Sequence, residues 1–201
     1  MDNVSKTTRP RPRKRRSDAE HSAAAVLDAA VEVLGRQPDA KLEQVAEAAG
    51  VTRQTVYAHY PSRPLLVAAV VDRITAEAVT ALDAAALDSG TSTGALLAWL
   101  EVTWRLFDRY PLLQHPSVTG MDRSDSDQHH APVAERLERL IVNGQTAGEF
   151  DRDLSPAWLV SATVALGHAA GVEVAAGRMT AEEASESLRH SVLRVYGAGR
   201  A

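Results

Sequence analysis

Hydrophobic side chains recur every three or four residues along most of this chain, which is the period of one face of an α-helix. No stretch shows the sustained alternation that is typical of a β-strand. The first periodic run follows Ser17, which together with Glu20 has the form of a capping box, and Gly35 ends the run. The pattern therefore predicts an all-α protein of about nine helices, the first beginning at Ser17.

Two short periodic runs follow the first helix. One covers residues 41–48 and stops before Gly50, and the other begins near Thr52 and is cut off by Pro61. Three short helices with a glycine at the turn between the second and the third are typical of a helix-turn-helix. We therefore expect a DNA-binding domain at residues 17–65. A small three-helix unit without a role in DNA binding would show the same periodicity.

The remaining residues, 66–201, predict a larger helical domain. A helix over residues 95–110 is apolar on two faces, so we expect it near the centre of this domain. The run MDRSDSDQHH at residues 121–130 is polar and is interpreted as a loop. Two capping signals mark the starts of the last two helices, Ser155 with Pro156 and Thr180 with Glu183.

Helical geometry predicts which side chains of the third short helix point away from the protein. Val56 is the inward position, so a rotation of about 100° per residue turns Gln54 outward, with Thr55 and Tyr57 beside it. Glutamine can make two hydrogen bonds to adenine, and a threonine methyl can contact the methyl of thymine. Arg53 lies nearer the inner face, but its length lets it reach guanine or phosphate.

Charge is distributed unevenly along the chain. Residues 1–16 hold seven Lys or Arg and a single Asp, a net charge of +6, although the whole chain carries −4. The helix-turn-helix region itself contains more acidic than basic side chains. Because affinity for DNA depends on neutralised phosphates, we expect a disordered basic arm at residues 1–16 to supply the positive charge. A solvated tail is the alternative. The arm's candidate contacts are Arg13, Lys14, Arg15 and Arg16.

The segment GVTRQTVYAHYPSRPLLVAAV, residues 50–70, resembles the helix-turn-helix signature of TetR-type transcriptional repressors. The resemblance is specific over about residues 20–70, and GEFDRDLSPAWL at 148–159 is similar to the turn before the dimerisation helices of that family. The signature positions are filled by Gly50, Val51, Thr52, Val56, Tyr57, His59, Tyr60, Ser62 and Arg63.

The resemblance implies that the third helix reads the major groove, with Thr52, Tyr57 and His59 fixing the DNA backbone. It also implies that Arg63 grips a phosphate at the start of the fourth helix. Pro64 follows Arg63 and disfavours helical dihedral angles there, which predicts that Arg63 is a cap residue. The expected DNA-binding set within the helix-turn-helix is Lys41, Thr52, Arg53, Gln54, Thr55, Tyr57, His59, Tyr60 and Arg63.

By the same resemblance, the larger domain dimerises and binds a small, largely apolar effector. The helix at about 156–176 is nearly uncharged and rich in small residues, and the last helix has Leu188, Val192 and Val195 at helical spacing. We expect a homodimer through these last two helices, with a purely intramolecular core as the alternative. A membrane span is a poor interpretation of this stretch, because it contains Pro156 and barely reaches spanning length.

Aromatic and polar side chains of the larger domain supply the candidates for the effector pocket, since such sites are mostly apolar with a few orienting polar groups. His168 stands alone on an apolar helix, where an interior histidine with satisfied hydrogen bonds is the alternative. The predicted ligand-binding set is Trp99, Thr103, Trp104, Phe107, Tyr110, His115, Met121, Trp158 and His168.

Other classes of function find little support in the sequence. The chain has no cysteine, which excludes disulfides and thiolate metal sites, and the Asp and His residues at 122–130 lack the spacing of known metal sites. No phosphate-binding loop or nucleophile elbow occurs. We therefore expect a cytoplasmic repressor, not an enzyme, that binds a palindromic operator in double-stranded DNA and is released by its effector, without cofactor, metal or membrane. A small-molecule-binding or enzymatic helical protein with a vestigial helix-turn-helix is the alternative.

Overall fold

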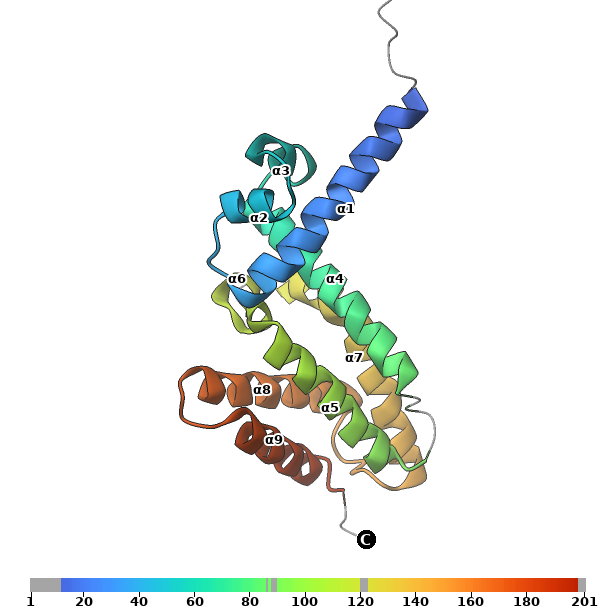
Figure 1. The fold of residues 1–201 in the computed structure, drawn as a ribbon. Helices are drawn as coiled ribbons and strands as arrows, with labels where there is room; N and C mark the ends of the chain where they lie inside the picture. The colour runs from blue at the N-terminus through green and yellow to red at the C-terminus, as the bar shows by residue number, and fades with distance from the viewer. Residues whose placement is uncertain (1–11, 86, 88–89, 120–122, 199–201) are drawn as a thin grey trace, which may run out of the picture.

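The computed structural model describes residues 12–85, 87, 90–119 and 123–198, and every regular element within them is a helix (Figure 1). This confirms the predicted all-α class. The elements in chain order are α1 (Pro12–Arg36), α2 (Leu42–Ala48), α3 (Arg53–His59), α4 (Arg63–Ala84), α5 (Ser92–Arg109), the 3₁₀-helix η1 (Pro111–Gln114), α6 (Pro116–Thr119), α7 (Arg123–Ala147), α8 (Pro156–Ala175) and α9 (Ala181–Val195).

The first helix begins earlier than the sequence pattern predicted. α1 starts at Pro12, so Ser17 lies inside the helix and does not cap it. Proline is well tolerated in the first turn of a helix, and arginine and lysine are good helix formers, so a basic stretch without apolar periodicity can still extend a helix. The prediction of a disordered arm to residue 16 is therefore wrong for residues 12–16, while residues 1–11 lie outside the described part.

The polar run at 121–130 is also helical where the structure describes it. α7 begins at Arg123 and continues through Pro132, so the prediction of a loop is wrong from residue 123 onward. Short polar residues such as serine and aspartate are favourable near a helix N-terminus, where backbone N–H groups lack partners. Hydrophobic periodicity gives no sign of this start, because a helix that extends beyond its core contacts needs no apolar face.

The first hydrophobic core joins the three N-terminal helices to α4. Val26 of α1, Val45 of α2 and Val56 of α3 are fully buried and belong to one cluster with Leu66 and Val70 of α4. Val56 therefore faces inward, as the helical geometry predicted. The same cluster continues into Tyr110 and η1, so the helix-turn-helix rests directly on the rest of the protein.

The second core lies among α5, α7, α8 and α9. Leu96 and Leu100 of α5 pack in one cluster with Ile141 of α7, Leu159 of α8 and Val192 of α9. α5 is buried along much of its length and contacts α4, α7 and α9, which agrees with the predicted central position. α4 contributes Leu82 to this core as well, so one continuous helix runs through both cores.

The last two helices, α8 and α9, pack side by side (Figure 1). Leu188 and Val192, which were predicted to contribute to a dimer interface, are buried within the same protomer. The exposed apolar residues lie on α8, where Trp158, Val164 and Val172 expose 59%, 43% and 54% of their surface. By length and composition alone α8 could cross a membrane, and 28% of its most apolar window is buried.

Tyr196, the residue after α9, closes the second core. Its ring meets Phe150 edge-on at 5.2 Å between centroids, and its hydroxyl lies 2.8 Å from Oγ1 of Thr163. The Thr163 hydroxyl in turn donates a hydrogen bond to the carbonyl oxygen of Leu159. Burial raises the pKa of Tyr196 to about 12, because a phenolate would lose its hydration there.

This burial predicts a loss of stability at alkaline pH. The tyrosine ionises near pH 10 in the unfolded chain and near pH 12 in the folded one, so its contribution is complete below pH 10 and declines as the pH rises through 12. We expect wild-type protein to lose about 2 kcal/mol more than Tyr196→Phe between pH 9 and pH 12, measured by urea unfolding. Parallel pH profiles for the two proteins would contradict this assignment.

Candidate functional site

The turn between α2 and α3 has the backbone that a helix-turn-helix requires. Gly50 has φ of +66°, a left-handed conformation that glycine adopts without strain. The N–H of Val51 donates to the carbonyl oxygen of Ala46 at 2.9 Å, which closes the turn. Thr52 then caps α3, because its hydroxyl accepts the N–H of Thr55 at 3.2 Å. This capping role of Thr52 was not part of the prediction from sequence.

α3 presents one polar face to solvent. Gln54 is exposed, Thr55 is half-buried, and Tyr57 exposes 37% of its surface, whereas Val56 is fully buried. These residues lie where the helical geometry predicted. At the end of the helix, His59 is half-buried. The face is short and polar, and Gln54 on it is a side chain that can make two hydrogen bonds to adenine.

Arg53 lies on this exposed face and not nearer the inner one. Its side chain is 58% exposed, and one terminal nitrogen pairs with Oε1 of Glu43 at 2.5 Å. The other terminal nitrogen donates to the hydroxyl of Tyr57 at 3.3 Å, and the guanidinium lies 5.3 Å from the centroid of that ring. The hydrogen bond to Tyr57 and the charge of Glu43 raise the pKa of Arg53. These partners were not visible in the sequence pattern.

Arg63 is engaged inside the protein. It is the first residue of α4, and the cap is Ser62, so the prediction that Arg63 is the cap is wrong. Its guanidinium donates to the carbonyl oxygen of Ala40 at 2.7 Å and to that of Pro38. Pro64 is tolerated after it because residues of the first turn need no intrahelical N–H bond. Arg63 therefore fixes the loop between α1 and α2, and a phosphate would have to compete with two carbonyl groups.

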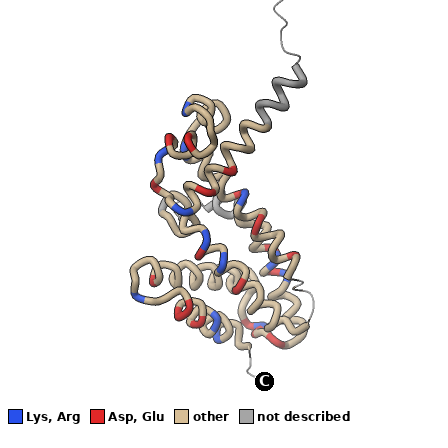
Figure 2. Tube along the Cα trace, in the orientation of Figure 1, with Lys and Arg blue, Asp and Glu red and all other residues tan. Residues whose placement is uncertain are grey.

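The remaining predicted DNA-contacting residues flank this face. Lys41 is exposed at the start of α2, where its N–H donates to Oε1 of Gln44 at 2.8 Å. Tyr60 is half-buried against the first core, and desolvation raises its pKa. Arg13, Lys14, Arg15 and Arg16 lie in the first turns of α1, and only their backbone is described. Figure 2 shows basic and acidic residues side by side on α2 and α3.

The predicted effector-binding residues do not converge on one pocket. Trp99 is buried, and its Nε1 has no hydrogen-bond partner among the described residues. Thr103 donates back to the carbonyl oxygen of Trp99 at 2.9 Å. Tyr110 is buried and donates to Glu77 of α4 at 2.8 Å, while Trp158 is exposed on α8. Met121 lies outside the described residues. Sequence spacing placed these side chains on helices but could not show which helix faces meet.

Part of the predicted set meets where α5, η1 and α8 come together. The rings of Phe107 and His168 lie 5.6 Å apart, and burial lowers the pKa of His168. Gln114 was not in the predicted set. It lies against Gly171, and its buried Oε1 has no partner among the described residues. His115 points elsewhere, since its Nε2 lies 3.3 Å from Asp39 in the loop after α1.

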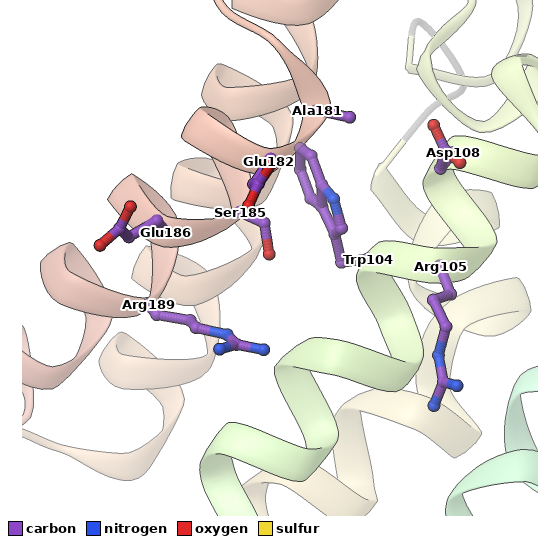
Figure 3. A pocket seen from close by; sticks show the side chains of 8 residues that line it. All are labelled: Trp104, Arg105, Asp108, Ala181, Glu182, Ser185, Glu186 and Arg189. Carbon is purple, nitrogen blue, oxygen red and sulfur yellow. The ribbon is translucent and has the colours of Figure 1, made fainter.

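A cleft of about 570 Å³ lies between α5 and α9 (Figure 3). Trp104 projects from α5 toward the start of α9, and among the described members of the predicted set it alone lines this cleft. The expectation was a largely apolar pocket, but the walls of this cleft are mostly charged. They consist of Trp104, Arg105, Asp108, Ala181, Glu182, Ser185, Glu186 and Arg189.

Comparison with known proteins relates this arrangement to one family. Residues 26–70 match the family model described as bacterial regulatory proteins, tetR family. The chain is 39% identical over 77 residues to the HTH-type transcriptional repressor LfrR of Mycolicibacterium smegmatis. That alignment covers 38% of this chain and 41% of the repressor, less than half of either protein.

Solved structures resemble most of the chain. A putative TetR-family transcriptional regulator from Rhodococcus sp. superposes with a TM-score of 0.71 at 18% identity, over 87% of this chain and 98% of that one. LfrR from Mycobacterium smegmatis, in complex with proflavine, superposes with a TM-score of 0.62 at 26% identity, over 87% and 96%. Residues 26–70 therefore match the helix-turn-helix of the tetR family of bacterial regulatory proteins, and the larger body shares the fold of solved regulators of that family.

Proposed function

We propose that this protein is a cytoplasmic, homodimeric transcriptional repressor that binds a palindromic operator and releases it when a small molecule binds. The observation that carries the proposal is the exposed face of α3, where Gln54 and Arg53 stand outward beside Tyr57 on a helix fixed by buried Val56. A recognition helix of this kind reads base edges in the major groove.

The proposed dimer forms through α8, whose exposed apolar side chains are not covered by other parts of the same chain. Trp158, Val164 and Val172 are exposed on a helix without charge over most of its length. Exposed apolar patches of this kind mark interaction surfaces, and in a twofold dimer the same patch pairs with itself. To bind a palindrome, such a dimer must hold its two recognition helices at the spacing of successive major grooves, about 34–36 Å.

The effector is proposed to bind between α5 and α8. The rings of Phe107 and His168 meet there, and Gln114 Oε1 is buried against Gly171 without a partner among the described residues, so a ligand that donates to this oxygen would recover the cost of its desolvation. Tyr110 ties α5 to Glu77 of α4, and α4 packs on the helix-turn-helix. A ligand that prefers one position of α5 would therefore shift the separation of the recognition helices.

A salt titration of DNA binding tests the repressor proposal. We expect selection from a random DNA pool to yield a preferred palindrome, and the affinity for it to fall steeply with salt. Deleting residues 1–16 should lessen the slope of log K against log salt by about 0.9 for each phosphate that the segment neutralises.

Gln54→Ala provides the contrasting control, because it removes a base-reading group without changing charge. It should alter the preferred sequence and leave the salt slope unchanged. A full-length protein that selects no sequence at any salt concentration would overturn the repressor proposal.

A further inference from the structure

Arg53 is held in place by two helices before any DNA is present. Its two terminal nitrogens are engaged separately, one by Glu43 of α2 at 2.5 Å and the other by the hydroxyl of Tyr57 on α3 at 3.3 Å. The guanidinium also lies 5.3 Å from the centre of the Tyr57 ring. An arginine side chain on a helix surface ordinarily samples many rotamers, and these contacts restrict it.

Stability does not account for the ion pair. The side chains of Arg53 and Glu43 are 58% and 52% exposed, and ion pairs at such exposed positions contribute little to folding. A carboxylate on this surface also opposes DNA binding, because it repels phosphate. Glu43 therefore weakens the general attraction to DNA while it fixes the position of one cation on the recognition helix.

We propose that Glu43 is a positioning residue that holds Arg53 for contact with a guanine, and so determines the preference at one base pair of each half-site. The inference rests on the proposed function of α3 as the recognition helix. Arg53 is the first residue of α3, and the N-terminal residues of a recognition helix are those that reach base edges.

The chemistry of the guanidinium supports this assignment. It has five N–H groups, and the contacts to Glu43 and Tyr57 engage only part of them. Guanine presents two acceptors, O6 and N7, to which arginine donates a pair of hydrogen bonds. Without Glu43, Arg53 would be free to pair with the nearest phosphate of the DNA backbone. The negative charge of Glu43 competes for the guanidinium and repels the phosphate, so it makes that contact less favourable.

The test compares two substitutions on α2 that remove the same charge. Glu43→Gln replaces the ion pair to Arg53 with at most a weaker hydrogen bond to a neutral amide oxygen, whereas Glu47→Gln changes an exposed carboxylate one turn later on the same helix. Binding of the full chain to its selected operator is measured with each base in turn at every position. We expect Glu43→Gln to lower the discrimination for guanine at one base pair about tenfold and to raise the affinity for random DNA. Glu47→Gln should raise the affinity for random DNA and leave the discrimination unchanged.

A double-mutant cycle completes the test. Arg53→Ala should abolish the guanine preference at the same base pair, and adding Glu43→Gln to Arg53→Ala should change nothing further there. An equal effect of the two glutamine variants on discrimination, or a guanine preference that survives Arg53→Ala, would overturn the inference while leaving the repressor proposal intact. Failure to select any operator would refute the proposed function itself.

Discussion

Val164→Glu is expected to convert the protein from a dimer to a monomer and to lower its affinity for the palindromic operator by more than about 100-fold. Val164 is 43% exposed on the uncharged face of α8. In the proposed dimer this face is covered by its symmetry mate, so the substitution would bury two carboxylates without partners. Each monomer would then bind a single half-site. It would lose the gain in affinity that a dimer obtains because binding at one half-site raises the effective concentration of the second recognition helix at the other. Sedimentation velocity and operator titration measure the two effects.

Val142→Glu is the matched control for this substitution. Val142 is 45% exposed and lies on α7, so the variant adds the same charge at a valine of similar exposure. It should remain dimeric and bind the operator with nearly wild-type affinity. If Val164→Glu stays dimeric at the concentrations used, or if both variants dissociate equally, α8 is not the principal interface.

Gly144→Ala is expected to destabilise the fold by about 2 kcal/mol and to lower the melting temperature by about 6 °C. Gly144 is buried in α7, and an added Cβ would overlap the ring of Phe150. The N–H of Phe150 donates to the carbonyl oxygen of Gly144, and the ring of Phe150 packs edge-on against Tyr196. Because both contacts hold Phe150 in place, its ring cannot move away from the added Cβ. The overlap outweighs the gain of about 1 kcal/mol that alanine brings to a helix.

Gly171→Ala offers a contrast at a second buried helical glycine. The group in its way is the end of the Gln114 side chain, which can rotate out of the path. The helical preference of alanine should therefore nearly offset the rearrangement, and we expect the melting temperature to change by less than about 2 °C. A calorimetric scan that finds Gly171→Ala as damaging as Gly144→Ala would contradict the rigidity assigned to Phe150.

The helix-turn-helix could be predicted from sequence because its determinants are local. The positive φ of Gly50, the burial of Val56 and the outward position of Gln54 all follow from residue type and helical period. The starts of α1 and α7 could not be predicted in this way, since charged residues extend a helix without leaving an apolar trace.

The contacts of the candidate sites depend on tertiary packing and were beyond sequence reasoning. Nothing near Arg63 in the chain indicates that its guanidinium meets the carbonyl oxygens of Pro38 and Ala40, which precede it by more than twenty residues. Likewise, the aromatic residues of α5 were correctly placed on a helix, but Trp99 and Trp104 point into different surroundings. Residue type alone does not distinguish a core tryptophan from one that lines a cleft.

The passage of α4 through both cores has a consequence for protein engineering. If the DNA-binding region were exchanged with that of a relative at residue 65, the junction would fall inside α4, between Arg63 and Leu66. In a hybrid joined there, α1 would come from one parent and Leu66 and Val70 of α4 from the other. Side chains from two different proteins would then have to pack together at the centre of the first core. A junction beyond Ala78, the last α4 residue of the first core, would transfer more of that cluster from a single parent. A segment exchanged between two such proteins should therefore extend beyond the helix-turn-helix and include α4 as far as Ala78.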